Sequence, residues 1–230
     1  MTIRSKRPPS LHTFCSWSGG KDSCLALYKA IQQGQVPGVL FTMMVEGGEV
    51  SRSHALPRSL LEAQARQLGL PIVFRSATWN DYEDTFIEML KEFKTAGIDQ
   101  GVFGDIDVEP HLEWVQRVCK VAGITPIHPL WKAPRRALLE EFIALKFKAT
   151  VVVVNESMLD ASFLDRTIDA ATVADMEKAG IDASGEAGEY HTVVTGGPLF
   201  FGEIPLVRHG IKHHEGYAFL PVSVRTHTPQ

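Results

Sequence analysis

Residues 18–23 read Ser-Gly-Gly-Lys-Asp-Ser, and the rest of the chain is easiest to interpret from this run. Residues 11–17 before it mix β-branched, aromatic and small side chains, which favours a strand. Residues 24–33 after it repeat large apolar side chains every three residues without a proline, which predicts a helix. Two glycines let the backbone approach a ligand closely, and the N–H groups and dipole of a helix start favour phosphate oxygens. The run therefore predicts a phosphate-binding loop, to which Lys21 adds a mobile positive charge.

The spacing within this loop excludes two common phosphate-binding motifs. A Walker A loop needs a glycine five positions before Gly20, where this chain has Cys15, and a Ser or Thr where it has Asp22. The Rossmann fingerprint needs Gly-x-Gly-x-x-Gly, which an adjacent glycine pair does not provide. The run resembles instead the Ser-Gly-Gly-x-Asp-Ser loop of the ATP pyrophosphatases, or PP-loop proteins, which holds the two phosphates that leave as pyrophosphate. The alternative is a simple glycine turn with a helix N-cap at Asp22 or Ser23.

Length and composition indicate a globular chain without a nucleic-acid-binding surface. The chain has 230 residues, of which 44% are hydrophobic and 22% are charged, and its formal net charge is -4. This is enough for one large domain, or for a nucleotide-binding domain with a smaller companion. Without a basic stripe, RNA or DNA is not expected as the main partner. The longest aliphatic run, residues 151–154, is far too short to cross a bilayer, so no membrane partner is expected.

The cysteines and the N-terminus predict a cytoplasmic location. Cys15, Cys24 and Cys119 form neither a C-x-x-C pair nor an even set for disulfides, which suits a reducing compartment and argues against a structural zinc site. Pro8 and Pro9 stand where a signal peptide would need an apolar run. We expect the first residues to form a flexible tail.

Strands and helices are predicted to alternate along the first 156 residues. The predicted strands are 11–17, 39–45, 72–77, 101–106 and 150–155, and the predicted helices are 24–33, 56–68, 81–96, 110–122 and 134–147. The segment 124–131 contains two prolines and is expected to be irregular. Short connections between alternating elements predict an α/β fold, with a five-stranded parallel sheet covered by helices on both faces. In the PP-loop fold that the loop resembles, the strand order is 3-2-1-4-5, so Gly104 and Asp105 would face the phosphate loop across the crevice.

The composition changes after residue 156. Residues 157–184 predict helical pieces, and short strands are predicted at 192–195, 199–201, 206–209 and 219–224. We therefore expect two domains. Residues 1–156 would bind the nucleotide, and residues 157–230 would form a smaller C-terminal α+β lobe that binds the substrate.

A second group of reactive residues lies at 185–192, which read Gly-Glu-Ala-Gly-Glu-Tyr-His-Thr. Glu186 and Glu189 form a flexible acidic turn between glycines that could bind Mg²⁺, hold ammonium or orient a nucleophile. Such a turn is by itself more often only solvated. A phosphate-binding loop in the same chain favours the functional interpretation.

Four motifs in this order resemble the diphthine-ammonia ligase family over nearly the whole chain. They are the loop 18–23, Gly104-Asp105-Ile106, Pro129-Leu130-Trp131 and the run 185–192. Ser53-His54 before a helix that carries Gln64-Ala65 is similar to a further stretch of this family. Ala55 and Asp165 depart from the family pattern, which has glycine at both positions.

The resemblance implies an ATP-dependent amide ligase. ATP would adenylate a carboxylate, of diphthine or a similar group, with release of pyrophosphate, and ammonia would then displace AMP to leave a primary amide. The implied cofactors are ATP and Mg²⁺, and the implied partners are ammonium and a diphthine-bearing translation elongation factor. We also expect a homo-oligomer.

The residues that match the family motifs are the candidates for these roles. The ATP-binding candidates are Ser16, Ser18, Gly19, Gly20, Lys21, Asp22, Ser23, Gly104 and Asp105. The catalytic candidates are Lys21, Asp22, Asp105, Glu186 and Glu189. The candidates for binding substrate or ammonium are Glu186, Gly188, Glu189, His191 and Thr192. Asp22 and Asp105 would support Mg²⁺ that is held through the phosphates.

Two alternatives remain open from the sequence. The chain could be a pyrophosphatase with another acceptor, such as a tRNA or a small carboxylate. However, thiolating members use cysteine chemistry that this chain lacks, and there is no room for the amidotransferase domain of glutamine-dependent members. The second alternative is a non-catalytic ATP- or AMP-binding module, which would release neither AMP nor pyrophosphate.

Overall fold

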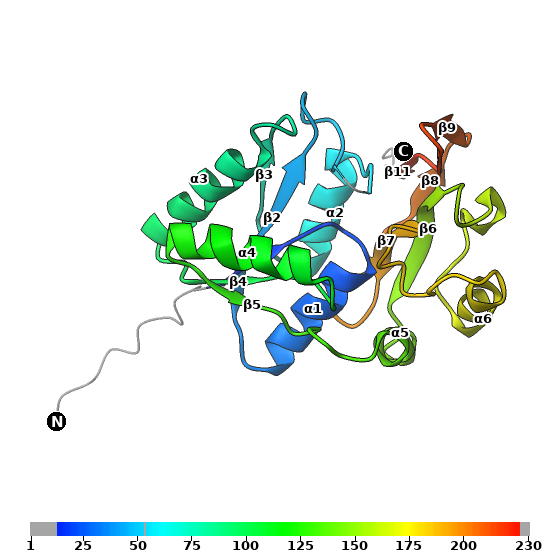
Figure 1. The fold of residues 1–230 in the computed structure, drawn as a ribbon, viewed down its shortest axis with the longest axis horizontal. Coiled ribbons are helices and arrows are strands. Elements are labelled where there is room, and N and C mark those ends of the chain that lie inside the picture. The colour runs from blue at the N-terminus through cyan, green and yellow to red at the C-terminus, as the bar shows by residue number, and fades with distance from the viewer. Residues whose placement is uncertain (1–12, 53, 226–230) are drawn as a thin grey trace, which may run out of the picture.

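A computed structural model describes residues 13–52 and 54–225 of the chain. It contains a five-stranded sheet from the first part of the chain, a four-stranded sheet from the second part and a two-stranded sheet (Figure 1). The expected N-terminal tail lies outside the described residues.

The five-stranded sheet is parallel throughout, with the order β3-β2-β1-β4-β5. Its strands are β1 (Thr13–Ser16), β2 (Pro37–Met44), β3 (Ile72–Ser76), β4 (Gln100–Val102) and β5 (Thr125–Ile127). The predicted order 3-2-1-4-5 is confirmed. The strand order reverses between β1 and β4, which is where open α/β sheets bind their ligands.

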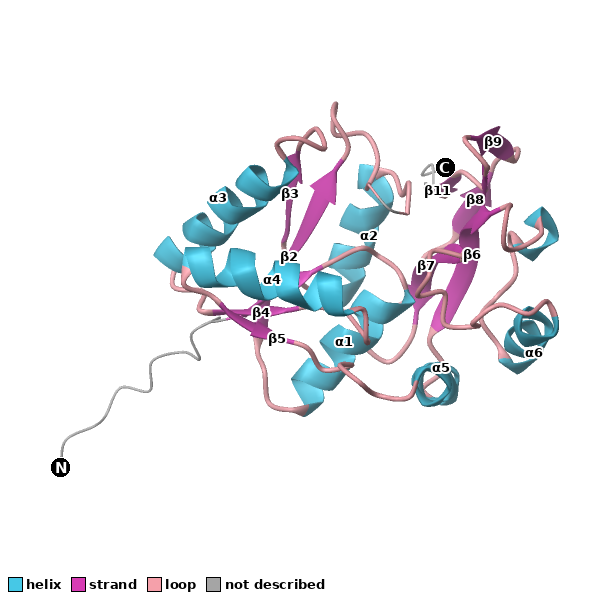
Figure 2. Ribbon diagram, in the orientation of Figure 1, coloured by secondary structure: helices cyan, strands magenta, loops and turns pink. Residues whose placement is uncertain are grey.

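Helices cover both faces of this sheet, as predicted (Figure 2). They are α1 (Lys21–Gln32), α2 (Arg58–Leu68), α3 (Tyr82–Thr95) and α4 (Glu109–Ala122). Successive side chains of a strand point to opposite faces. In β2, which is buried along its whole length, Phe41 and Met43 belong to the apolar cluster with α3 and α4, whereas Leu40 and Met44 belong to the cluster with α1 and α2.

The prediction of the fifth strand was wrong. The fifth parallel strand is β5, inside the segment that was expected to be irregular because of its prolines. Pro126 is tolerated there because β5 is the edge strand, where one side of the backbone needs no partner. The apolar run 150–155 forms part of β6 (Lys148–Asn155), which lies in the second sheet.

The second sheet is antiparallel, with the order β7-β6-β10-β9. Its other strands are β7 (Tyr190–Gly196), β9 (Lys212–His214) and β10 (Tyr217–Phe219), while β8 (Leu206–Arg208) pairs with β11 (Val222–Val224). The helices of this part are α5 (Arg135–Ala144), the short η1 (Ala161–Phe163) and α6 (Ala170–Lys178). The strand expected at 199–201 does not form, and the single strand expected at 219–224 is two strands with Pro221 between them. The two-domain division at residue 156 stays a prediction, although the chain changes sheets earlier, between β5 and β6.

The two large sheets share one core and meet at the phosphate loop, residues 18–23. A single cluster of buried apolar side chains includes residues of α1, α2, β6 and β7. Gln64 is fully buried, and its Nε2 donates to the carbonyl oxygens of Gly19 at 2.9 Å and Val194 at 2.7 Å. Its Oε1 accepts from Trp17 Nε1 at 2.9 Å, so this one side chain connects β7 with the segment that enters the loop.

Two further features bear on the expectations from composition. Among the described residues, no helix combines the length and the apolar character that a membrane crossing requires. Cys15, Cys24 and Cys119 are buried free thiols.

Candidate active site

The phosphate loop follows β1 at the carboxyl edge of the parallel sheet. Gly19 has φ +82°, a left-handed conformation that favours glycine. A Cβ at Gly19 would come within 2.7 Å of Gln64 Oε1, and a Cβ at Gly20 would come within 2.3 Å of His54 Cε1. Both glycines are thus needed for the packing of the loop against protein side chains, in addition to the predicted approach of a ligand.

The start of α1 has backbone donors available for an anion. Its N-cap is Gly20, without a side-chain cap, so the alternative of a cap at Asp22 or Ser23 is not what forms. The N–H of Lys21 donates to Thr192 Oγ1 at 3.0 Å, and that of Gly20 donates to Ser18 Oγ at 3.3 Å. Within the described residues, the N–H groups of Asp22 and Ser23 have no protein acceptor and can bind phosphate oxygens.

Lys21 places its positive charge beside the phosphate loop. Its side chain is buried, and Nζ lies 2.7 Å from Asp22 Oδ2 and 5.4 Å from the ring centre of Tyr190. Burial opposes the charged form, but the nearby Asp22, Tyr190 and Glu186 outweigh it and raise the pKa of Lys21. The ammonium group therefore stays charged beside the loop.

Two cavities adjoin at the start of α1. The first has a volume of about 630 Å³ and lies between the phosphate loop, the α3 and α4 helices and the segment after β4. The second has a volume of about 500 Å³ and lies between the loop, His54 and the turn at 185–192. Asp22, Asp105 and His111 line both cavities, so the two spaces meet at these three side chains.

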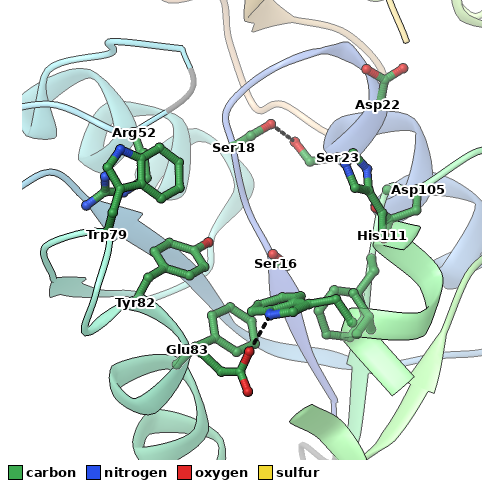
Figure 3. Close-up of a pocket in the computed structure, with 15 residues that line it drawn as sticks. Ser16, Ser18, Asp22, Ser23, Arg52, Trp79, Tyr82, Glu83, Asp105 and His111 are labelled. Carbon is green, nitrogen blue, oxygen red and sulfur yellow. Dashed lines mark hydrogen bonds and ion pairs between the residues drawn. The ribbon is translucent and has the colours of Figure 1, made fainter. Parts of the chain in front are cut away.

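The first cavity is polar at one end and aromatic at the other (Figure 3). The hydroxyls of Ser18 and Ser23, 3.0 Å apart, lie at the polar end with Ser16. Tyr82 lies away from the loop, and its ring centre is 5.8 Å from that of Trp114, which also lines the cavity. This arrangement suits a nucleotide whose phosphates lie at the loop and whose base packs on aromatic rings.

An arginine and a tryptophan form the outer rim of this cavity (Figure 3). The guanidinium carbon of Arg52 lies 4.3 Å from the centre of the Trp79 ring, and Trp79 is 75% exposed. Neither residue was among the candidates. The segment around Arg52 carries no recognisable phosphate-binding pattern, so its position follows only from the fold.

Gly104 and Asp105 lie opposite the phosphate loop, as the predicted topology required. A Cβ at Gly104 would lie 3.0 Å from the backbone nitrogen of Ser23. Asp105 lies between two histidines, with Oδ2 at 3.6 Å from His128 Nδ1 and Oδ1 at 3.8 Å from His111 Nδ1. Its carboxylate thus reaches the junction of the two cavities.

The carboxylates at this junction fit the expected mode of metal binding. Among the described residues there is no group of three or more His, Cys, Asp or Glu side chains that could hold a metal ion on its own. Mg²⁺ in nucleotide sites is commonly held by one or two carboxylates together with phosphate oxygens. Asp22, whose carboxylate also pairs with Lys21, and Asp105 would supply such a partial set of ligands.

Of the two glutamates predicted in the acidic turn, only Glu186 lines a cavity. Burial raises the pKa of Glu186 to about 7, and Asp22 acts in the same direction while Lys21 opposes it. Glu189 is 2% exposed, and its Oε2 accepts the N–H of Ala187 at 2.9 Å. Glu189 therefore holds the shape of the turn.

The turn that carries Glu186 is anchored by ion pairs. Arg135, at the start of α5, donates from Nε to Asp107 at 2.8 Å and from a terminal nitrogen to Asp182. This network connects the segment before α4 with the segment before the turn. It fixes the wall of the second cavity from outside.

Two neutral histidines complete the second cavity. The rings of His54 and His191 lie 4.6 Å apart between centres. Burial lowers the pKa of both, and for His191, with His54 and Lys21 adding to the effect, to about 3. His191 was a candidate, whereas His54 appeared only within a stretch similar to a known family. Its role in a cavity could not be read from the sequence, because its partner Thr192 is 138 residues away.

Comparisons with known proteins agree with the motifs. Residues 11–126 match the family model described as the diphthamide synthase N-terminal domain, and residues 134–225 match the diphthamide synthase C-terminal domain. The chain is similar to the diphthine–ammonia ligase of Mus musculus, with 28% identity in an alignment 236 residues long, gaps included. This alignment covers 90% of this chain and 86% of that protein. It is also similar to the diphthine–ammonia ligase of Homo sapiens, with 27% identity over 90% of this chain and 86% of that protein.

Solved structures are also similar to this chain. One of them is described as a predicted subunit of tRNA methyltransferase from Methanocaldococcus jannaschii, with 18% identity, a TM-score of 0.44, and coverage of 81% of this chain and 97% of that chain. A likeness at this score carries no argument about function.

Proposed function

The chain belongs to the diphthamide synthase family, a family of ATP-dependent ligases, and from this premise we propose that it adenylates a carboxylate and converts it to a primary amide with ammonia. The proposed acceptor is diphthine or a similar carboxylate, because the similar vertebrate proteins are named for that substrate. In this proposal residues 1–156 hold ATP and residues 157–230 hold the acceptor.

The observation that carries this proposal is the meeting of two cavities at the phosphate loop. The first cavity has hydroxyls at the loop and aromatic rings at its far end, which suits ATP. The second cavity brings Glu186 and two histidines to the same loop, which suits an acceptor and a nucleophile. A two-step transfer needs such an arrangement. The acyl adenylate forms with the ATP of the first cavity and must then be attacked by ammonia from the second cavity.

In the first step, the protein stabilises the charge that grows on the departing pyrophosphate. The N–H groups of Asp22 and Ser23 and the positive charge of Lys21 are the proposed donors. A bound Mg²⁺, supported by Asp22 and Asp105, would neutralise part of the phosphate charge. The carboxylate oxygen of the acceptor attacks the α-phosphorus as the bond from this phosphorus to the pyrophosphate oxygen breaks with its electron pair, and AMP stays attached to the acyl group.

In the second step, ammonia replaces AMP. Glu186 is the proposed proton acceptor, since a carboxyl with a pKa of about 7 changes charge readily near neutral pH. The turn at 185–192, held by Glu189 and the Arg135 network, forms one wall of this space. Exclusion of water there favours amide formation over hydrolysis of the intermediate.

The proposal is tested by product analysis. The protein is incubated with ATP, Mg²⁺, ammonium and a diphthine-bearing elongation factor, and we expect AMP and pyrophosphate in equal amounts with conversion of the acceptor to its amide. Lys21→Met, which keeps the apolar part of the side chain, is expected to lower pyrophosphate formation by roughly 10²–10³-fold with little change in melting temperature. Release of ADP would contradict the proposed bond cleavage.

Two other outcomes separate the alternatives. Formation of AMP with a different carboxylate, but not with diphthine, would keep the first step and change the acceptor. Tight binding of ATP without AMP or pyrophosphate, whatever the acceptor, would favour a binding module. The expected homo-oligomer is checked on the same preparation by light scattering.

A further inference from the structure

We propose that the second cavity is the ammonia site, and that His54 is a catalytic residue there, whose Nε2 accepts a hydrogen bond from the attacking ammonia. The inference rests on the proposed function, because it assigns the nucleophile of the same two-step reaction. It adds a residue that none of the expected roles included.

The hydrogen bond of His54 fixes which of its ring nitrogens is an acceptor. Nδ1 lies 2.8 Å from the carbonyl oxygen of Thr192. A carbonyl oxygen can only accept, so Nδ1 carries the proton, and in the neutral ring Nε2 carries a lone pair. Nε2 can therefore accept a hydrogen bond from a donor in the cavity, and ammonia and ammonium are such donors.

The charges around the cavity also favour a small cation as the incoming ligand. Asp22, Asp105 and Glu186 line it, and the cation among its lining residues, Lys21, already pairs with Asp22 at 2.7 Å. Ammonium carries donors only, so every such oxygen and the lone pair of Nε2 can face it favourably. A metal ion held by protein alone fits less well, because the described residues contain no group of three or more metal-binding side chains.

His54 is placed where the nucleophile must stand. A Cβ on Gly20 would lie 2.3 Å from His54 Cε1, so the ring packs directly against the phosphate loop. The same cavity adjoins the nucleotide cavity at Asp22 and Asp105. Ammonia bound at Nε2 would thus be close to the acyl group that has just received AMP.

The chemistry balances without a change of charge on His54. Ammonium first loses one proton, which Glu186 or solvent accepts. The lone pair of the nitrogen then forms the C–N bond, and the C–O bond to AMP breaks with its electron pair staying on AMP. A second proton then passes from the nitrogen to the phosphate of the departing AMP or to solvent, which leaves the neutral amide. His54 contributes orientation, because a hydrogen bond to Nε2 turns the nitrogen lone pair toward the carbonyl carbon.

Two substitutions of His54 distinguish the role of Nε2 as a hydrogen-bond acceptor from the role of the ring in packing. His54→Asn places its amide nitrogen near the site of Nδ1, so it can still donate to Thr192, but it has no atom at Nε2. His54→Gln extends its amide to the region of Nε2 and can supply an acceptor oxygen there. His209→Asn, at an exposed histidine bonded to Ser223, serves as the control.

Two half-reactions are measured with each variant. Acceptor-dependent exchange of pyrophosphate into ATP reports adenylation without ammonia, and amide formation against ammonium concentration reports the second step. For His54→Asn we expect the ammonium KM to rise about tenfold or more, the loss of about one hydrogen bond, and to rise by a larger factor than any fall in exchange. His54→Gln should recover part of this loss, and His209→Asn should show none. An unchanged ammonium KM in His54→Asn, or an equal loss of exchange, would overturn the proposal.

A second measurement does not depend on the acceptor. In protein with ¹⁵N-labelled histidine, we expect the Nε2 resonance of His54 to have the shift of an unprotonated nitrogen and to move when ammonium chloride is added with ATP and Mg²⁺. A protonated Nε2, or no response to ammonium beyond that to sodium chloride, would overturn the ammonia site. If this response is present while wild type shows no exchange, the proposed acceptor chemistry fails and the ammonia site stands.

Discussion

Glu186 and Glu189 stand three residues apart in one turn, but their surroundings give them different roles. Glu189 is satisfied by a backbone N–H inside the turn, whereas Glu186 faces a cavity next to Asp22. Identical side chains at motif positions looked equivalent in the sequence. Burial and neighbouring charge, which depend on the fold, distinguish them.

The raised pKa of Glu186 predicts a pH-dependent effect on stability. The pKa of Glu186 is about 7 in the folded protein and near the ordinary 4.5 in the unfolded chain. Between these two pH values Glu186 is therefore protonated more often in the folded state than in the unfolded state. The free energy of unfolding therefore falls as pH rises from about 4.5 to about 7. Because Glu186 is partly exposed, we expect Glu186→Gln to stabilise the protein by on the order of 1–2 kcal/mol at pH 8, with the gain much smaller at pH 5.

Urea unfolding at the two pH values checks this prediction. Glu189→Gln, in the same turn, is the control that keeps the Glu186 carboxylate. An equal gain in the free energy of unfolding from Glu186→Gln at pH 5 and pH 8 would show that the pKa of the Glu186 carboxyl is not raised. Amide formation should fall in Glu186→Gln, while adenylation is retained.

Ala55 predicts a second effect on stability, through backbone strain. Its φ is +51°, and Asp165 has φ +65°; these are the two positions where the similar family has glycine. A left-handed residue with a Cβ costs roughly 1–2 kcal/mol, and glycine costs roughly 0.5–1 kcal/mol in chain entropy. We therefore expect Ala55→Gly to raise the free energy of unfolding by about 0.5 kcal/mol, measured by urea denaturation. Ala63→Gly in α2 should lower it by about 1 kcal/mol, and a loss from Ala55→Gly would contradict the assigned strain.

The segment after β4 closely approaches the backbone at the start of α1. A Cβ at Gly104 would lie 3.0 to 3.2 Å from backbone atoms of Asp22 and Ser23, which cannot rotate away as a side chain does. We predict that Gly104→Ala displaces the phosphate loop and weakens ATP binding by about tenfold or more. Calorimetric titration with ATP measures this. Gly210→Ala, whose Cβ would have no neighbour within 4 Å, is the control and should bind ATP normally.

Helices were easier to predict than strands, for reasons visible in particular elements. The helix ends at Gly69 and Gly123 have left-handed glycines, which mark a stop in the sequence itself. An apolar run such as that in β6 looks the same in a parallel and in an antiparallel sheet, because both bury it on two faces. The three-residue strands β9 and β10 are too short to show a period.

The molecule as a whole is predicted to unfold as one unit. One apolar cluster extends through α1, α2, β6 and β7, and Gln64 bonds to both sides of the junction. We expect a single calorimetric transition with equal calorimetric and van't Hoff enthalpies. Gln64→Leu leaves Trp17 Nε1 without its acceptor and removes a donor from the carbonyls of Gly19 and Val194, although Gly19 keeps the N–H of Val194. This should cost about 2–4 kcal/mol without splitting the transition. Gln67→Leu, in the same helix, should cost far less, and two separate transitions would contradict a shared core.

The order of the parallel sheet and the place of the phosphate loop could be predicted because a six-residue motif fixes a strand, a turn and a helix together. The second cavity could not, since it forms only when Thr192 reaches His54 and Lys21 from the other sheet. Contacts over such sequence distances leave no periodic pattern. The position of β6 in the second sheet also depends on contacts that are distant in the sequence, so it could not be predicted either.

Thr192 receives the N–H of Lys21 through its hydroxyl and the Nδ1–H of His54 through its carbonyl. A redesign of the proposed ammonia site for bulkier amines, such as methylamine or hydroxylamine, should therefore leave Thr192 unchanged and begin at another residue. His191 lines the same cavity, and a smaller side chain there would enlarge the space without removing either of these two hydrogen bonds of Thr192.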